Sequence, residues 1–389
     1  MELKEYQQTA LDQVKTYLDK LTEWRKRSEK DPESEIDFAQ KAWEKATKGK
    51  SYHVRKDGLG RPLPNFCLKI PTGGGKTLLA AKAIDLINTT YLHKRTGIVL
   101  WIVPSEQIYS QTIRSLRDRE HPYRQTLDIA SGGRTLILEK ADRFSPGEVQ
   151  ENLAILMLML PSANRLNKET LKVFKDTGGF QDFFPLEDDI QGHADILKQV
   201  RNLDYFGSGD GFWGRQVKTS LGNTLRLLSP IIILDEGHRA YSEGAQQTLF
   251  GFNPSIIVEL SATPTEQSNV LVKITGLELL REDMIKLDLH LVNKASPDWK
   301  DTLLAAVNQR DLLEREAKDY HANTNTYIRP ICLIQVERTG KDQRGAGKVH
   351  AEDVREWLVL THGIPAEQVA VKSHQVNELK DEDDIGGLM

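Results

Sequence analysis

The stretch CLKIPTGGGKTLLAAK, residues 67–82, decides the fold of this chain. An apolar run leads into three glycines, Gly73–Gly75, which are followed by Lys76, Thr77 and a segment with helical character. Between a strand and a helix, such glycines allow backbone N–H groups to surround a phosphate chain, and the helix N-terminus adds partial positive charge. The sequence therefore predicts a phosphate-binding loop in a strand–loop–helix unit.

The loop also predicts which groups contact a nucleoside triphosphate. Lys76 is expected to reach the β- and γ-phosphates, and the Thr77 hydroxyl is expected to bind Mg²⁺. The strict pattern G-x-x-x-x-G-K-[ST] has glycine where this chain has Ile70, so the match departs at one position. The nucleotide contacts are assigned to Pro71, Thr72, Gly73, Gly74, Gly75, Lys76 and Thr77.

Apolar runs alternate with helical patterns along most of the chain. The expected strands are residues 65–70, 97–103, 127–130, 154–160, 230–234, 255–260, 284–292, 331–336 and 368–372. The expected helices are residues 1–30, 76–88, 105–116, 145–153, 192–203, 298–320 and 350–361. Continuous apolar strands separated by helices predict a parallel sheet covered on both faces, in an α/β fold.

Three parts are expected along the chain. Residues 1–50 form a helical segment, residues 51–325 form the first domain, and residues 326–389 begin a second α/β unit. The first domain contains an insertion at about 162–228, with the Gly- and aromatic-rich stretches GGFQDFF and FGSGDGFWG. The insertion is either an elaborated connection packed on the sheet or a surface for nucleic acid or a partner.

Composition narrows the class of protein. The 389 residues are 39% hydrophobic and 28% charged, which is typical of a soluble globular protein. Cys67 and Cys332 are the two cysteines, so a disulfide framework is not expected and a reducing, cytoplasmic setting fits. No apolar run approaches the ~18 residues of a membrane span. The net charge of −4 argues against a coat of basic residues but leaves room for a local basic groove.

The stretch PIIILDEGHR, residues 230–239, adds a second group of site candidates. Asp235 and Glu236 follow a buried-type strand, where a carboxylate beside the phosphate loop completes a Mg²⁺ site. We assign Asp235 to the metal and Glu236 to positioning and deprotonating the attacking water. SATP, residues 261–264, ends the next strand, so Ser261 and Thr263 are expected to hydrogen-bond Glu236 or His238 and couple phosphate state to domain geometry.

In this order, PTGGGKT, DEGH and SATP resemble the motor core of superfamily 2 helicases and translocases of the DEAD/DEAH type. The resemblance implies a RecA-like fold, with ATP and Mg²⁺ as cofactors. LKEYQQTALD resembles the upstream glutamine element, which would make Gln7 the reader of the adenine edge, with Tyr6 or Arg55 nearby. WIVPSEQIYSQ and SGGR resemble nucleic-acid contact loops. The backbone contacts implied are Pro104, Ser105, Gln107 and Arg134.

More narrowly, KDGLGRPLPNFCLKIPTGGGKT, LDEGHRA and VELSATPT resemble the Res subunit of type III restriction enzymes and its defence-associated relatives. That resemblance implies an ATP-hydrolysing DNA helicase or translocase in restriction or phage defence, with DNA favoured over RNA. Any sequence specificity would come from another domain or from a partner, such as a methyltransferase subunit.

The sequence also departs from that family. RPICLIQVE resembles the start of a second RecA-like domain, but no arginine-finger motif follows before residue 389. Because an arginine finger contributes about 10³–10⁵ in rate, weak hydrolysis is expected from this chain alone. The alternative function is a nucleotide-dependent binding module of a larger complex. A small-molecule kinase would leave Gln7 and SATP unexplained.

Basic residues follow the first nucleic-acid contact loop. IRSLRDREHPYR, residues 113–124, contains Arg114, Arg117, Arg119 and Arg124. These side chains either line a phosphate track or form the solvated face of a helix.

Overall fold

The computed structural model describes most of the chain, in two compact units, Met1–Asp288 and Leu289–Met389. The described residues are 3–31, 33, 36–159, 179–208, 214–237, 243–284, 292–293, 298–337, 348–372 and 378. The division falls at 288/289, whereas the sequence suggested a boundary at 325/326.

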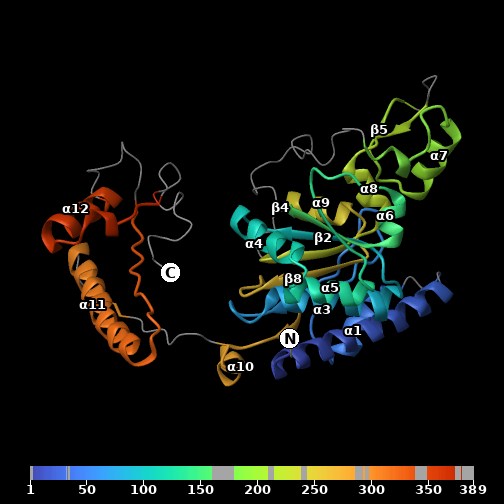
Figure 1. Ribbon diagram of the computed structural model, residues 1–389. Coiled ribbons are helices and arrows are strands. Elements are labelled where there is room, and N and C mark those ends of the chain that lie inside the picture. The colour runs from blue at the N-terminus through green and yellow to red at the C-terminus, as the bar shows by residue number, and fades with distance from the viewer. Residues whose placement is uncertain are drawn as a thin grey trace. The chain divides into compact units, whose positions relative to one another are not determined.

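The first unit is built on a seven-stranded sheet (Figure 1). Its strands are β1 (Asn65–Lys69), β2 (Gly97–Val103), β3 (Thr135–Glu139), β4 (Leu153–Met159), β7 (Ile231–Asp235), β8 (Ile256–Ser261) and β9 (Val270–Lys273). They lie in the order β3-β4-β2-β7-β8-β1-β9, and every neighbouring pair is parallel. The predicted parallel α/β sheet is therefore confirmed.

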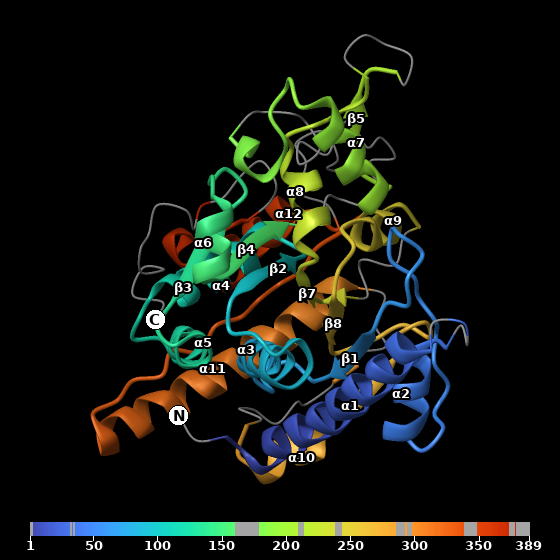
Figure 2. The ribbon, with the colours of Figure 1, turned by 90° about the vertical axis from the view of Figure 1, so that its right-hand side faces the viewer.

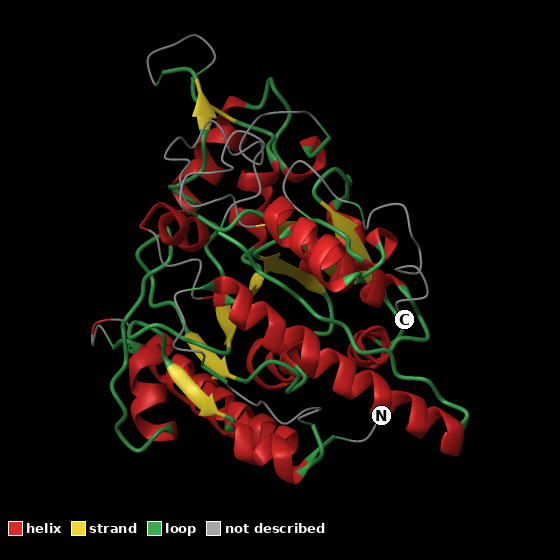
Figure 3. Ribbon diagram, turned by 90° about the vertical axis from the view of Figure 1, so that its left-hand side faces the viewer, coloured by secondary structure: helices red, strands yellow, loops and turns green. Residues whose placement is uncertain are grey.

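Helices cover both faces of this sheet (Figures 1 and 3). One face carries α1 (Glu5–Lys30), α2 (Phe38–Ala46), α3 (Lys76–Leu86, continued by a π-helix, Ile87–Leu92), α4 (Glu106–Arg117), α5 (Pro122–Ser131) and α10 (Gly276–Arg281). The other face carries α6 (Pro146–Glu151), α8 (Leu221–Leu228) and α9 (Glu243–Gly251).

Strand β2 shows why the central strands are apolar throughout. Val99, Trp101 and Val103 pack into the core beneath α1 and α3, while Leu100 and Ile102 pack into the core beneath α6 and α8. Because successive side chains of a strand point to opposite faces, a strand between two cores must be apolar at every position.

The N-terminal helices belong to the first unit. In α1 the buried side chains recur at helical spacing, and the Tyr17 ring meets the rings of Trp43 and Phe66 edge to face at 5.8 and 5.7 Å. Trp43 comes from α2 and Phe66 from β1, so residues 1–50 share their core with the sheet (Figure 2).

One strand assignment in the first unit needs correction, and two strands were missed. Residues 127–130 lie in α5, because Pro122 starts that helix and Gly132, at φ 67°, ends it. The strand in this part of the sheet is β3, just downstream, and β9 was also not predicted. The strand expected at 284–292 falls mostly on residues outside those described.

The second unit contains α11 (Trp299–Thr324) and α12 (Ala351–His362). Leu303 and Val307 of α11 pack with Val354 and Leu358 of α12 in a small core. The sequence had placed α11 in the first domain, but this packing assigns it to the second unit. No strand forms among the residues described here; residues 331–336 are extended, and Leu333 is 93% exposed. The predicted strand at 368–372 is likewise not formed as a named strand.

The described part of the insertion contains α7 (Ile190–Gln199) and a two-stranded antiparallel ribbon, β5 (Tyr205–Phe206) and β6 (Gln216–Val217). Over the described ranges, no helix has both the length and the apolar character needed to cross a membrane.

Candidate active site

The sheet order brings three predicted motifs to one edge. Strand β8 lies between β7 and β1, with Ser261 opposite Lys69 and Leu260 opposite Asp235. The Ile70 amide continues the pairing by donating to the Ser261 carbonyl oxygen at 3.0 Å. The phosphate loop, the Asp235–Glu236 pair and the start of SATP therefore leave the sheet side by side, at its carboxyl edge.

The phosphate loop has the backbone that its glycines predict. Gly73 and Gly75 lie in the left-handed region, at φ 84° and 80°, and Gly75 directly precedes α3. The Gly74 amide donates to the Pro71 carbonyl at 3.1 Å. Ile70, which replaces the first glycine of the strict pattern, is fully buried, and its Cγ2 lies 2.7 Å from where a Cβ on Gly74 would stand. The Ile70 side chain therefore fills the space under the loop. A side chain at position 74 would collide with it, so this position requires glycine.

Lys76 and Glu236 meet across this edge. The Lys76 ammonium group contacts the Glu236 carboxylate, although 160 residues separate them in sequence. Their side chains are 12% and 24% exposed. Glu236 has φ 49°, an unfavourable conformation for a residue with a side chain and one that often occurs at functional sites. The structure thus joins the phosphate-loop lysine to the proposed water-activating carboxylate.

Asp235 lies beside this pair. Its Oδ1 accepts a hydrogen bond from the Glu236 amide at 3.0 Å. Burial raises the pKa of the Asp235 carboxyl, and the positive charge of Lys76 partly opposes that rise. Thr77, in the first turn of α3, is partly buried.

One carboxylate and one hydroxyl fit Mg²⁺, which binds oxygen ligands and keeps several waters and phosphate oxygens in its shell. The described residues contain no group of three His, Cys, Asp or Glu side chains arranged to hold a metal by themselves.

The glutamine element packs directly on the phosphate loop. The Tyr6 hydroxyl donates to the Gly74 carbonyl at 3.2 Å, and burial raises the pKa of Tyr6. The buried Gln7 amide accepts from the Lys4 amide at 3.1 Å, and its Nε2 lies 2.6 Å from where a Cβ on Gly75 would stand. Gln7 therefore caps α1 and supports the loop; its reading of adenine stays a prediction.

Arg55 does not join this group. Its Nη2 donates to the Gln267 carbonyl at 3.0 Å, and its guanidinium lies over the Phe250 ring, 5.6 Å from the centroid. Residues 265–269 lead into the amino end of β9, so Arg55 lies toward the opposite edge of the sheet. It is therefore not placed with Tyr6 and Gln7.

The coupling residues are placed in part. Ser261 is fully buried, and its hydroxyl accepts from the Thr263 amide at 3.2 Å. Thr263 itself is exposed. His238 lies outside the described residues, so its contact with these hydroxyls stays a prediction.

The nucleic-acid candidates separate into two places. Pro104, Ser105 and Gln107 follow β2 at the carboxyl edge, where Ser105 caps α4 by accepting from Ile108 at 3.4 Å and Gln107 is exposed. Arg134 instead precedes β3, and its carbonyl accepts from the Leu153 amide at 2.8 Å, at the amino edge. The structure does not bring Arg134 to the side of the sheet that holds the other three.

Two of the four arginines near α4 have structural partners. Arg124 is buried and donates to Asp128, to the Leu116 carbonyl and to the Thr135 carbonyl at 2.9, 3.2 and 3.1 Å. Arg117 pairs with Glu139 at 2.6 Å. Arg114, Arg117 and Arg119 are exposed. Burial removes Arg124 from a phosphate track at the surface, and a track formed by the other three stays a prediction.

Sequence reasoning missed Glu259. It is buried on β8, accepts from the Ser268 hydroxyl at 2.9 Å and packs against Gly237, which leaves no room there for a side chain. This carboxylate thus positions the backbone just after Glu236. A charged residue inside the apolar run of β8 was the available signal.

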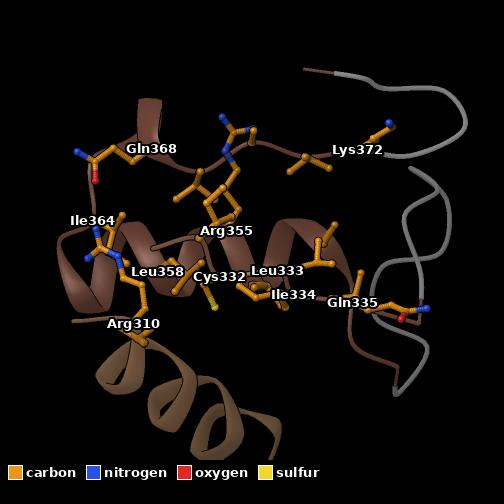
Figure 4. A pocket seen from close by; sticks show the side chains of 18 of the residues that line it. Arg310, Cys332, Leu333, Ile334, Gln335, Arg355, Leu358, Ile364, Gln368 and Lys372 are labelled. Atoms are coloured by element: carbon orange, nitrogen blue, oxygen red, sulfur yellow. The ribbon is translucent and has the colours of Figure 1, made fainter. Parts of the chain in front are cut away.

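A pocket of about 590 Å³ lies in the second unit (Figure 4). Its walls are residues of α11 and α12 and of the segments 329–336 and 368–372, with Arg310 and Arg355 among its basic members. Arg355 pairs with Glu378 at 2.9 Å. None of the residues that the sequence assigned to the nucleotide lines this pocket.

Comparisons with known proteins give one family model and two solved structures that are similar to this chain. Residues 1–266 match the family model described as "Type III restriction enzyme, res subunit". A search of curated proteins gives no match. One similar solved structure is a nuclease-deletion mutant of the Type ISP restriction-modification enzyme LlaGI in complex with a DNA substrate mimic, at 15% identity and TM-score 0.27, covering 75% of this chain and 23% of that one. Another is the Pyrococcus furiosus Hef helicase domain, at 17% identity and TM-score 0.24, covering 83% of this chain and 52% of that one.

Proposed function

We propose that this chain, which belongs to the family of type III restriction enzyme res subunits, is the ATP-binding motor portion of a DNA helicase or translocase. The predicted fold class, a RecA-like P-loop domain on a parallel sheet, agrees with both the family and the observed strand order. The chain spans about a quarter of one solved relative and about half of the other, so the activity of the whole protein is part of the proposal.

The observation that carries the proposal is the contact between Lys76 and Glu236. A lysine at the start of α3 and a carboxylate after β7 meet only because β8 brings both strand ends to one edge. A structural ion pair would not need a loop with two left-handed glycines next to the lysine, whereas a phosphate site does.

The geometry suggests how the residues act in turn. The amides of Gly73–Gly75 surround the phosphates, and Lys76 moves from the Glu236 carboxylate to the β- and γ-phosphates. Glu236, released from the lysine, then positions and deprotonates the attacking water. Thr77 and Asp235 would hold Mg²⁺, which would neutralise charge on the phosphates.

The remaining assignments belong to the same proposal. Gln7 reads the adenine edge after leaving its capping position, while His238, Ser261 and Thr263 couple phosphate state to domain geometry. Pro104, Ser105 and Gln107 contact the DNA backbone. We also propose a role in restriction or phage defence, with a methyltransferase as partner subunit; family membership supports both.

A second candidate is a nucleotide-dependent binding module with little hydrolysis of its own. The second unit favours it, because no strand forms among its described residues, so the sheet of a second RecA-like domain is not seen there. In that case ATP would order the first unit for a partner, and hydrolysis would depend on groups supplied by another chain.

The test is the ATPase rate of the chain with and without duplex DNA, beside Glu236→Gln. DNA-stimulated turnover that disappears in the variant supports the motor. ATP binding without turnover supports the binding module. A chain that binds no ATP contradicts both functions.

A further inference from the structure

The insertion presents a ribbon whose role the nucleotide site does not explain. Strands β5 and β6 and helix α7 lie beyond α8, at the periphery of the first unit (Figures 1 and 2). The pairs are Tyr205 with Val217 and Phe206 with Gln216. The sequence left open whether this region is a packed connection or a binding surface.

The base of the ribbon is held firmly. Asn223, fully buried in α8, donates to the carbonyls of Asp204 and Lys218 at 2.8 Å each and accepts from the Asp204 amide at 2.9 Å. The Val217 amide donates to Nδ1 of the buried His193 at 3.2 Å. These buried hydrogen bonds fix the orientation of the ribbon relative to α7 and α8.

The outer part of the ribbon presents rings and cations to solvent. Tyr205 and Phe206 are 40% and 51% exposed. The Arg215 guanidinium lies 4.9 Å from the Tyr205 ring centroid, and the Lys218 ammonium lies 4.7 Å from that of Phe206. Because adjacent strand residues point to opposite faces, each face of the ribbon has one aromatic ring with one cation.

These cations are available to a ligand. Where the structure describes the chain, neither Arg215 nor Lys218 forms an ion pair. An apolar protein surface docking here would have to desolvate both charges without compensation. A nucleic acid offers a phosphate for each cation and a flat base for each ring.

We propose that the β5–β6 ribbon binds single-stranded nucleic acid, with bases stacked on Tyr205 and Phe206 and phosphates at Arg215 and Lys218. In a duplex, neighbouring base pairs cover the base faces, so exposed rings favour unpaired bases. The inference rests on the proposed DNA motor and adds a contact for separated strands, outside the loops after β2.

The experiment is fluorescence anisotropy of a labelled oligothymidine of about 20 nucleotides, compared with a duplex of equal length. Tyr205→Ala/Phe206→Ala should weaken single-strand binding at least about tenfold, because stacking on two rings is lost. Arg215→Gln/Lys218→Gln should lower the slope of log K against log salt by about 1.4, since each phosphate contact contributes about 0.7 for single strands.

A matched control is Lys198→Gln/Arg201→Gln, which removes two positive charges from α7 and the turn after it. It should leave the slope unchanged. Circular dichroism confirms that each variant is folded. Wild-type affinity in the aromatic variant overturns the proposal, and so does a loss confined to the duplex.

Failure of this inference is separable from failure of the proposed function. ATP affinity is measured on the same samples, and Lys76→Ala serves as a variant that should lose ATP yet keep the oligothymidine. If the wild type binds no ATP while the ribbon variants lose single strands, the motor proposal fails and the ribbon proposal stands. If ATP binds and ribbon variants bind normally, only the ribbon proposal fails.

Discussion

The phosphate loop and the β5–β6 ribbon differ in the burial and the ion pairing of their cationic side chains. Lys76 is mostly buried and contacts Glu236, whereas Arg215 and Lys218 lie over exposed rings without an ion pair in the described structure. The loop is also packed from below by Ile70 and from the side by Gln7, while the rings of the ribbon are open to solvent.

The difference concerns what a ligand must displace. Under the proposed function, a triphosphate at the loop has to replace the Glu236 carboxylate at Lys76. Part of its binding free energy is then spent on that exchange, so the loop selects groups that attract Lys76 more strongly than the carboxylate does. At the ribbon, a phosphate meets a hydrated cation, so binding is less selective and depends on salt. Four predictions test the loop side of this contrast.

The largest effect is expected from Lys76→Ala. The phosphates lose their charged contact and Glu236 is left without its cation, so ATP affinity should fall by at least about 30-fold, equivalent to about 2 kcal/mol or more. Binding of a fluorescent ATP analogue measures the loss. Lys82→Ala, further along α3, is the control and should bind normally. Unchanged ATP affinity in Lys76→Ala would contradict the assignment of this loop as a phosphate-binding site.

Gly75→Ala tests how tightly the loop is packed. The left-handed backbone should cost about 1–2 kcal/mol for alanine, and contact with the Gln7 amide adds to it. Gly132→Ala is the matched control, because Gly132 has φ 67° but open space around it. The midpoint temperature of thermal unfolding should fall further for Gly75→Ala than for Gly132→Ala. In a double-mutant cycle, Gln7→Ala should recover the excess; equal losses at the two glycines contradict the packing.

Glu236→Gln tests the exchange itself. Without the carboxylate charge, Lys76 is free for the phosphates, so ATP should bind roughly tenfold more tightly, or about 1.4 kcal/mol, while turnover disappears. Glu282→Gln removes a negative charge near the start of α1 and serves as the control for a general field effect. Weaker ATP binding in Glu236→Gln would mean that the ion pair does not compete with the nucleotide.

The smallest effect is expected from Asp235→Asn. Burial raises the pKa of Asp235 in the folded state above its ordinary value of 3.8, so the folded chain holds this proton more tightly than the unfolded chain. The ionised carboxylate therefore lowers the free energy of unfolding at neutral pH, and that cost disappears as pH falls through the raised pKa toward 3.8.

The asparagine variant should consequently be more stable than wild type at pH 7, by about 0.5–1 kcal/mol. Denaturant unfolding across the acidic range should show this difference closing as pH falls. Asp12→Asn, a substitution on the exposed side of α1, is the control. A variant less stable than wild type at neutral pH would contradict the burial argument.

Much of the candidate site was predictable because it depends on local chemistry. A left-handed loop needs glycine, and a strand between two cores must be apolar, so Gly73–Gly75 and residues 97–103 show their structure in sequence. The parallel sheet then followed from alternating strands and helices, and the order of strands placed Asp235 beside the loop.

Other features depended on neighbours that no local pattern shows. The apolar run 331–336 resembles 97–103, yet it stays extended without strand pairing because no strand lies beside it in the described second unit. Arg124 resembles its neighbouring arginines, but only packing shows that three acceptors hold it inside.

The sequence by itself determined the loop, the fold class and the residue types able to handle phosphate and Mg²⁺. Only the tertiary structure decided their partners: Lys76 with Glu236, Gln7 with Gly75, Glu259 behind Gly237, and Arg134 at the opposite edge. The physical reason is that backbone conformation and the spacing of apolar residues are properties of a few consecutive residues. Contacts between side chains far apart in sequence depend on strand order, which is set by the packing of the whole sheet.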